Sequence, residues 1–117
     1  MAYDKGLAQR VREILEEEPG FNEKKMFGGI GILFNGNMAC GILNDDIIIR
    51  VGPDNYEESM KKPYAREFDI TGRSMKGWVM ISSEGYESDE DLIEWLHKGV
   101  EYARSLPSKM KGNAGVG

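Results

Sequence analysis

Residues 30–51 read IGILFNGNMACGILNDDIIIRV, and this stretch decides the fold. It contains three apolar segments rich in strand-forming residues, at 30–34, 38–43 and 47–51. Asn35 and Gly36 form a two-residue hairpin signal, because a type I′ turn needs a positive φ at both central positions. The polar residues 44–46 predict a second turn, since their short side chains bond to the nearby backbone. The stretch therefore predicts three sequential antiparallel strands.

The flanking sequence predicts helices before and after these strands. Asp4 is the expected N-cap of a first helix with apolar residues at helical spacing, and Pro19 ends it. Ser88 is the expected N-cap of the last helix, with Asp91 three residues later. The remaining expected elements are a short helix at 54–62, strands at 66–70 and 77–82, and a weaker strand signal at 24–27.

The expected order of elements is α-β-β-β-α-β-β-α, which is typical of an α+β fold. In this fold a curved antiparallel sheet carries helices packed on one face. The other face is then partly open, which is a common route to a homodimer. We expect one domain over residues 1–108 and a flexible tail over residues 109–117, a segment with two lysines, three glycines and no acidic residue.

The charge balance argues against nucleic acid as the partner. With 15 basic and 20 acidic residues, the net charge is −5, whereas bulk binding of phosphate favours a basic protein. Residues 84–101 hold seven acidic side chains and one basic one, so direct DNA binding is the least favoured hypothesis. No apolar run approaches the ~18–20 residues of a membrane span, and residues 1–10 lack the apolar core of a secretory signal. We expect a cytoplasmic protein with no membrane partner.

Little in the sequence indicates catalysis. Cys40 and His97 are the only residues of their types, so any Cys–His nucleophile pair would need both. Cys40 falls within a predicted strand, where a small apolar residue packs. The glycine-rich residues 28–31 lack the third glycine of a dinucleotide-binding loop, because position 34 is Phe. They predict a bulge or the close approach of another backbone. We expect no enzyme activity, no metal and no cofactor.

The charged residues of most interest are Arg50, Arg73 and Lys76. Arg73 and Lys76 lie between two glycines, where backbone N–H groups and two cations favour an anion. A solvated hairpin loop is the alternative interpretation. Trp78 follows this loop and is expected to pack. Trp95 lies off the main apolar stripe of its helix, so it is either a core residue or an exposed protein contact.

Six short motifs occur in order along the chain. They are Met1-Ala2-Tyr3-Asp4, Lys25-Met26-Phe27-Gly28-Gly29, Asn35-Gly36-Asn37-Met38, Arg50-Val51-Gly52-Pro53, Met75-Lys76-Gly77-Trp78-Val79 and Ala103-Arg104-Ser105-Leu106-Pro107. The ordered set resembles the N-terminal domain of the TfoX/Sxy family of bacterial competence regulators. The resemblance implies an α+β domain similar to secretion-chaperone-like folds. It also implies a role in the transcription of competence genes, beside an activator of the cyclic-AMP receptor protein type.

We therefore expect a non-enzymatic interaction domain, a stand-alone relative of that N-terminal domain, that acts through protein contacts. A small anion- or ligand-binding domain is the alternative. The candidate partner- or anion-binding residues are Arg50, Arg73, Lys76, Lys25, Gly28, Gly29 and Trp78. The expected partners are proteins of the transcription machinery, such as the activator or RNA polymerase, with a second copy of this chain as a further candidate.

Overall fold

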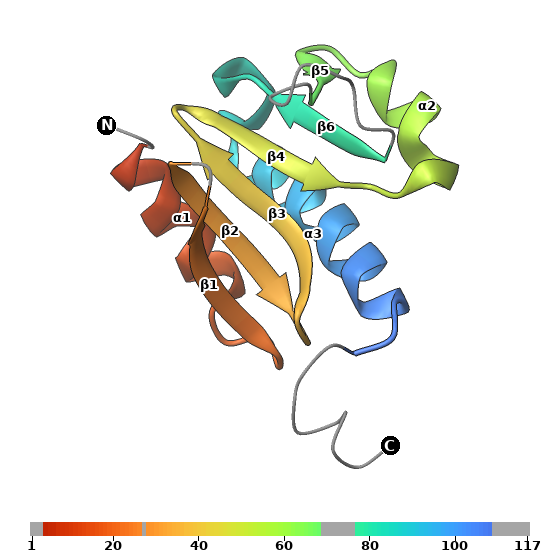
Figure 1. The fold of residues 1–117 in the computed structure, drawn as a ribbon. Helices are drawn as coiled ribbons and strands as arrows, with labels where there is room; N and C mark the ends of the chain where they lie inside the picture. The colour runs from red at the N-terminus through yellow and green to blue at the C-terminus, as the bar shows by residue number, and fades with distance from the viewer. Residues whose placement is uncertain (1–3, 27, 69–76, 109–117) are drawn as a thin grey trace.

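The computed structural model describes residues 4–26, 28–68 and 77–108. These residues form three α-helices and one antiparallel sheet of six strands (Figure 1). The elements are α1 (Lys5–Leu15), β1 (Phe21–Met26), β2 (Gly29–Phe34), β3 (Asn37–Leu43), β4 (Asp46–Arg50), α2 (Tyr56–Met60), β5 (Ala65–Glu67), β6 (Trp78–Ile81) and α3 (Asp89–Ser105), with short 3-10 helices at Pro53–Asn55 and Ser83–Tyr86. The strand order across the sheet is β1-β2-β3-β4-β6-β5, so the predicted α+β fold is confirmed.

The predicted meander corresponds to β2, β3 and β4. Asn35 has a φ of 55° and Gly36 a φ of 85°, which are the two positive values that a type I′ turn needs. Asn44, with a φ of 57°, leads the chain from β3 into β4. Both turns thus arise from the local preferences of the residues that form them.

The two edge strands differ most from the prediction. β1 pairs along its whole length with β2, from Phe21–Phe34 to Met26–Gly29, although the sequence signals only a short strand at 24–27. Its polar and charged residues carry little strand preference, and pairing with β2 supplies the order instead. At the other edge β5 pairs with β6 through three residues, while part of the predicted strand 66–70 falls outside the described residues.

Both long helices begin at the predicted caps. The Asp4 carboxylate accepts a hydrogen bond from the Leu7 N–H at 3.0 Å, and the Ser88 hydroxyl accepts one from the Asp91 N–H at 3.1 Å. These bonds satisfy backbone donors that a first helical turn otherwise leaves free. None of the helices in the described part of the chain combines the length and hydropathy that crossing a bilayer requires.

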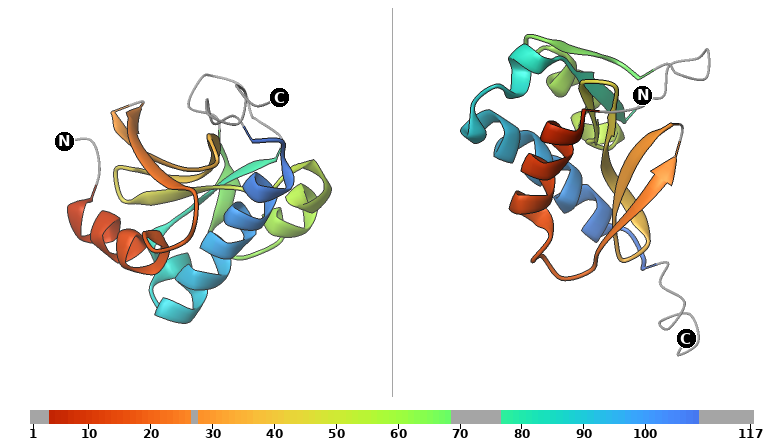
Figure 2. Two further views of the ribbon diagram at one scale, coloured as in Figure 1. Left: turned by 90° about the horizontal axis from the view of Figure 1, so that it is seen from below. Right: turned by 90° about the vertical axis from the view of Figure 1, so that its left-hand side faces the viewer.

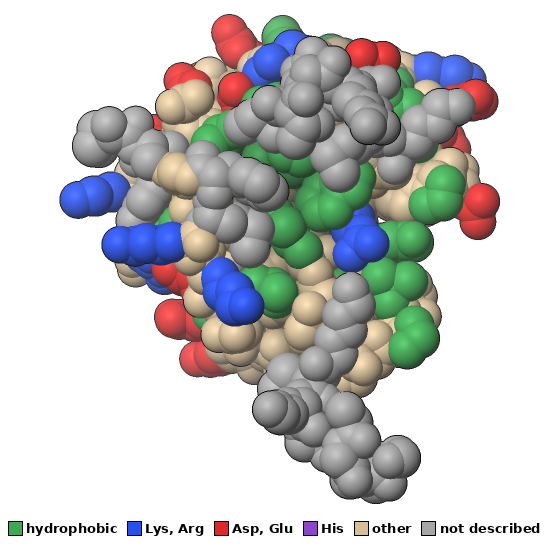
Figure 3. Space-filling model, viewed as in Figure 1, with side chains coloured by type: hydrophobic (Ala, Val, Ile, Leu, Met, Phe, Trp, Pro, Cys, Tyr) green, Lys and Arg blue, Asp and Glu red, His purple; other side chains and the backbone are tan. Residues whose placement is uncertain are grey.

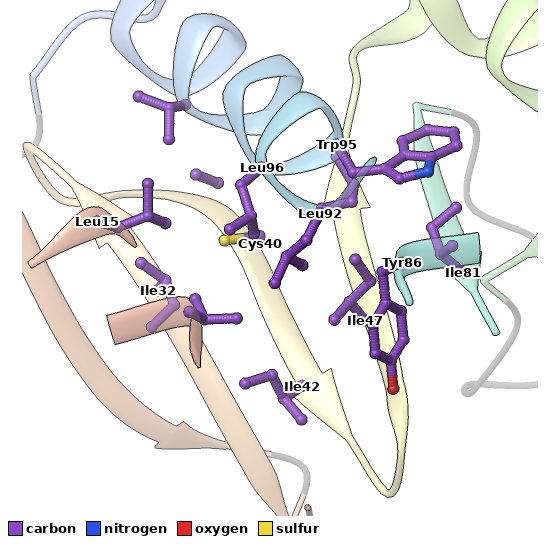
Figure 4. Packing of buried hydrophobic residues seen from close by; sticks show 14 of the residues in the cluster. Leu15, Ile32, Cys40, Ile42, Ile47, Ile81, Tyr86, Leu92, Trp95 and Leu96 are labelled. Atoms are coloured by element: carbon purple, nitrogen blue, oxygen red, sulfur yellow. The ribbon is translucent and has the colours of Figure 1, made fainter. Parts of the chain in front are cut away.

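The main core lies between the sheet and the two long helices. Figure 2 shows α1 and α3 on the same face of the sheet, as predicted. Side chains from both helices meet those of the central strands, among them Leu15, Ile32, Ile47 and Leu96 (Figure 4). Trp95 is 7% exposed and belongs to this core, so its interpretation as an exposed protein contact is wrong.

The opposite face of the sheet carries a smaller apolar cluster. Ile48, Phe68 and Met80 are buried there, and Leu43 and Trp78 pack against them. No helix of the described residues covers this face, which is turned toward the viewer in Figure 3. Trp78 belongs to this cluster and is paired with Arg50 across β4 and β6.

Candidate functional site

Two of the predicted site residues come together at the end of β4. Arg50 is the last residue of β4 and Trp78 is the first of β6, and the two are paired across the antiparallel strands. Directly opposed residues project from the same face of a sheet, so their side chains meet. The Arg50 guanidinium carbon lies 5.2 Å from the centre of the Trp78 ring, within cation–π range.

A third residue, Tyr102 of α3, completes this arrangement. The Arg50 guanidinium carbon lies 5.4 Å from the centre of the Tyr102 ring. All three side chains are half-buried. We refer to Arg50, Trp78 and Tyr102 as the arginine–aromatic cluster. Sequence reasoning missed Tyr102, which precedes the last motif by one residue, because no local pattern brings α3 to the end of β4.

The arginine has few oxygen partners for its charge. Its Nη1 donates one long hydrogen bond, of 3.4 Å, to the carbonyl oxygen of Met38. Among the described residues, no carboxylate lies within ion-pair distance of Arg50. A guanidinium has five N–H donors. Most of these donors are therefore open to an acceptor from outside this part of the chain.

Two glycines lie directly beside the cluster, and one of them makes room for the ring of Tyr102. Gly52 has a φ of 88°, and a Cβ atom there would lie 2.6 Å from the ring of Tyr102. The carbonyl oxygen of Gly77 accepts hydrogen bonds from the N–H groups of Val51 at 2.8 Å and of Gly52 at 3.0 Å. The segment after β4 is thus held against the segment before β6, directly beside the cluster.

The end of α3 is fixed to the sheet by Asn37. Its buried side-chain amide donates to the carbonyl oxygens of Pro107 at 2.9 Å and of Ala103 at 3.5 Å. These carbonyls belong to the region where a helix leaves acceptors without intrahelical partners. The contact holds the last turn of α3, and with it Tyr102, against the start of β3.

A shallow polar groove runs beside Tyr102. It has a volume of about 350 Å³ and is lined by Asn55, Lys98, Glu101, Tyr102 and Ser105. The Asn55 amide donates to the Val51 carbonyl at 3.3 Å, which attaches the groove wall to the end of β4. The groove places one cation and one anion, Lys98 and Glu101, next to the cluster.

Three other predicted site residues, Lys25, Gly28 and Gly29, lie away from the cluster. Lys25 is exposed near the end of β1, and Gly28 and Gly29 lie at the turn into β2. The pairs Ile30–Ile42 and Ile42–Ile47 place that turn at the end of the sheet where β4 begins, whereas Arg50 lies where β4 ends. The two groups therefore belong to opposite ends of the sheet.

The glycine at the start of β2 has a packing reason. A Cβ atom on Gly29 would lie 2.1 Å from the carbonyl oxygen of Ile42, so the predicted close approach of another backbone is confirmed there. Arg73 and Lys76 lie outside the described residues, and their part in the predicted site stays a prediction.

Cys40 and His97 do not have the environments that a Cys–His nucleophile pair needs. Cys40 is buried in the core, and burial raises the pKa of its thiol to about 12. The reactive thiolate is therefore scarce near neutral pH. His97 is exposed on α3. No group of three His, Cys, Asp or Glu side chains in the described residues is placed to hold a metal ion.

Comparison with known proteins identifies the family. The family model of the TfoX N-terminal domain matches residues 13–103, which include Arg50, Trp78 and Tyr102. The search of curated proteins found no match. Because the matched segment covers most of the chain and contains the whole sheet, the chain belongs to the TfoX N-terminal domain family.

Proposed function

We propose that this chain is a non-enzymatic interaction domain and that its arginine–aromatic cluster contacts a partner protein. The observation that supports this function is the half-buried Arg50 guanidinium, which lies over two rings and has no carboxylate partner among the described residues. Withdrawing a cation from water costs free energy unless a partner compensates. Arg, Trp and Tyr are also the residues most enriched among those that dominate binding at protein interfaces.

The family supports a regulatory role for that contact. The TfoX N-terminal domain family contains competence-regulator-like domains, and it is not known as a family of enzymes. The partner proposed on this basis is a component of the transcription machinery, either an activator of the cyclic-AMP receptor protein type or RNA polymerase. The low reactivity of the buried Cys40 thiol is consistent with a domain that acts by binding.

An affinity capture experiment tests this function. The chain, Arg50→Gln and Arg66→Gln are each immobilised and exposed to nuclease-treated lysate of the organism that encodes the chain. Arg66 is the matched control, because it is an arginine on the sheet that already pairs with Asp46 at 2.9 Å. We expect a transcription protein to bind the wild type and Arg66→Gln but not Arg50→Gln. Equal capture by all three proteins would remove the cluster from the proposal.

A small inorganic anion is the second candidate ligand. The open N–H donors of Arg50 suit phosphate as well as a protein group. A ligand at 100 times its Kd raises the free energy of unfolding by about 2.7 kcal/mol. Thermal unfolding with and without 10–50 mM phosphate (roughly the excess needed for a weak site) measures this stabilisation. A rise in Tm that Arg50→Gln abolishes would favour this candidate over the protein partner.

A further inference from the structure

We infer that the arginine–aromatic cluster receives the carboxylate of an aspartate or glutamate side chain, presented by a partner segment in which apolar residues flank the acid. The inference rests on the proposed function and gives the chemistry of the partner. It follows from the geometry of the guanidinium, from the charges around it and from the apolar side chains beside it.

The guanidinium is built for a planar anion. Its N–H donors form a rigid fork whose spacing matches the two oxygens of a carboxylate. The two ring contacts and the Met38 carbonyl hold this fork in place. Little rotamer freedom of Arg50 remains to be lost on binding, which favours affinity for a ligand that fits the fork.

The surrounding charges favour a ligand with one negative charge over a phosphate group. Tyr102 lies in the last turn of α3, and the C-terminal end of a helix carries partial negative charge. Glu101 and Lys98 line the adjacent groove with one charge of each sign, so the groove adds no net positive charge that would favour a doubly charged ligand. In the described residues the cluster contains a single cation, whereas phosphate sites gather several donors or a helix N-terminus. A carboxylate that binds through both oxygens needs only the N–H donors of one guanidinium.

The surface around Arg50 suits an apolar flank. The rings of Trp78 and Tyr102 lie against the guanidinium, and both residues are half-buried, so each has apolar surface left to cover. Met38, whose carbonyl accepts from Arg50, is half-buried as well. Figure 3 shows hydrophobic side chains in the middle of this view with Lys and Arg beside them, whereas acidic side chains lie toward its rim. The face thus complements a segment that combines an acid with aliphatic or aromatic residues, although the whole chain has a net charge of −5.

Selection of random peptides tests the inference without a known partner. Phage-displayed 12-residue peptides (a length of about 40 Å when extended) are selected on the full chain and counter-selected on Arg50→Gln. We expect recovered peptides to share an Asp or Glu next to an apolar residue. Peptides without an acidic preference, or no peptide that distinguishes the two proteins, would overturn the inference.

A double-mutant cycle then asks whether the acid meets Arg50. A synthetic peptide and its Asp→Asn or Glu→Gln version are titrated against wild type, Arg50→Gln and Arg66→Gln. We expect the peptide change and Arg50→Gln each to weaken binding about tenfold or more, with little further loss when they are combined. Arg66→Gln should bind like the wild type. Losses that simply multiply would show that the acid binds elsewhere.

The experiments distinguish a folding defect from a loss of binding, and a failure of the carboxylate inference from a failure of the proposed function. Circular dichroism and thermal unfolding verify each variant. If Arg50→Gln does not fold, Arg50→Lys replaces it, because Lys keeps the charge and loses the fork. Loss of the lysate partner in Arg50→Gln together with indifference to the peptide acid would refute the carboxylate and leave the proposed function standing. Retention of the lysate partner by Arg50→Gln would remove the cluster from the proposed function, and the carboxylate inference with it.

Discussion

Asn37, at the start of β3, donates its side-chain amide to the carbonyl oxygen of Pro107, which lies 2.9 Å away beyond the end of α3. The residue is 1% exposed, and within the described residues its own side-chain oxygen has no hydrogen-bond partner. Asn37 thus connects the hairpin between β2 and β3 to the end of the helix that carries Tyr102. This bond adds to the core packing of Leu96 and Val100, which also holds α3 against the sheet.

Asn37→Ala should lower the free energy of unfolding by about 1–3 kcal/mol, because it removes a buried side chain together with its hydrogen bonds to the Pro107 and Ala103 carbonyl oxygens. Urea unfolding measures the change. Asn22→Ala is the control, since Asn22 is exposed on β1 and should change stability by less than about 0.5 kcal/mol. A similar small change for both variants would mean that water replaces the Asn37 amide at no cost.

Gly52→Ala should destabilise the fold for two separable reasons. The φ of 88° is strained for alanine, and its Cβ would lie 2.6 Å from the Tyr102 ring. We expect a loss of about 1–3 kcal/mol. In a Tyr102→Ala background the ring clash is absent, so Gly52→Ala should cost less there. An identical cost in both backgrounds, measured by urea unfolding, would assign the whole effect to backbone strain.

Arg50→Met should leave the free energy of unfolding within about 1 kcal/mol of wild type. The variant loses cation–π contacts worth about 0.5–1 kcal/mol each, but it also removes the cost of withdrawing a charge from water. Arg12→Met is the control, because Arg12 forms a two-point contact with Glu23 at 2.7 and 2.8 Å and should cost more. If Arg50→Met costs more than about 2 kcal/mol, Arg50 is primarily a structural residue.

The same Arg12–Glu23 pair predicts a dependence of stability on pH. The hydrogen bond from Arg12 lowers the pKa of the Glu23 carboxyl below its ordinary value of 4.5, and the attraction of the guanidinium adds to this effect. A lowered pKa in the folded state means that the stabilisation is present above pH 4.5 and is lost as pH falls through the lower folded value.

Glu23→Gln should therefore lose stability mainly at neutral pH and approach the wild type in acid. Urea unfolding at pH 7 and about pH 3 compares the two proteins. Glu57→Gln, an exposed carboxylate of α2, is the control and should show little difference at either pH. A gap between wild type and Glu23→Gln that stays constant with pH would contradict the effect of the ion pair.

Only part of the candidate site was predictable from sequence. The sequence singles out Arg50 for its charge and Trp78 as part of the motif at 75–79, yet their direct pairing follows from the order of β4 and β6. Lys25, Gly28 and Gly29 belong to one short motif, at residues 25–29. They lie at the end of the sheet opposite to Arg50 and Trp78. Composition therefore identified suitable chemistry, while strand order decided which residues meet.

The sequence by itself determined the features whose partners lie within a few residues. The turn at Asn35 and Gly36 and the helix caps at Asp4 and Ser88 depend on local φ preferences and on hydrogen bonds that span three residues. Only the tertiary structure decided that β1 is a full strand and that residues 50, 78 and 102 form one cluster. The β1 strand depends on its pairing with β2, because its own polar residues carry little strand preference. The three cluster residues lie more than 20 positions apart in the sequence, and they meet because β4 pairs with β6 and α3 packs against the sheet.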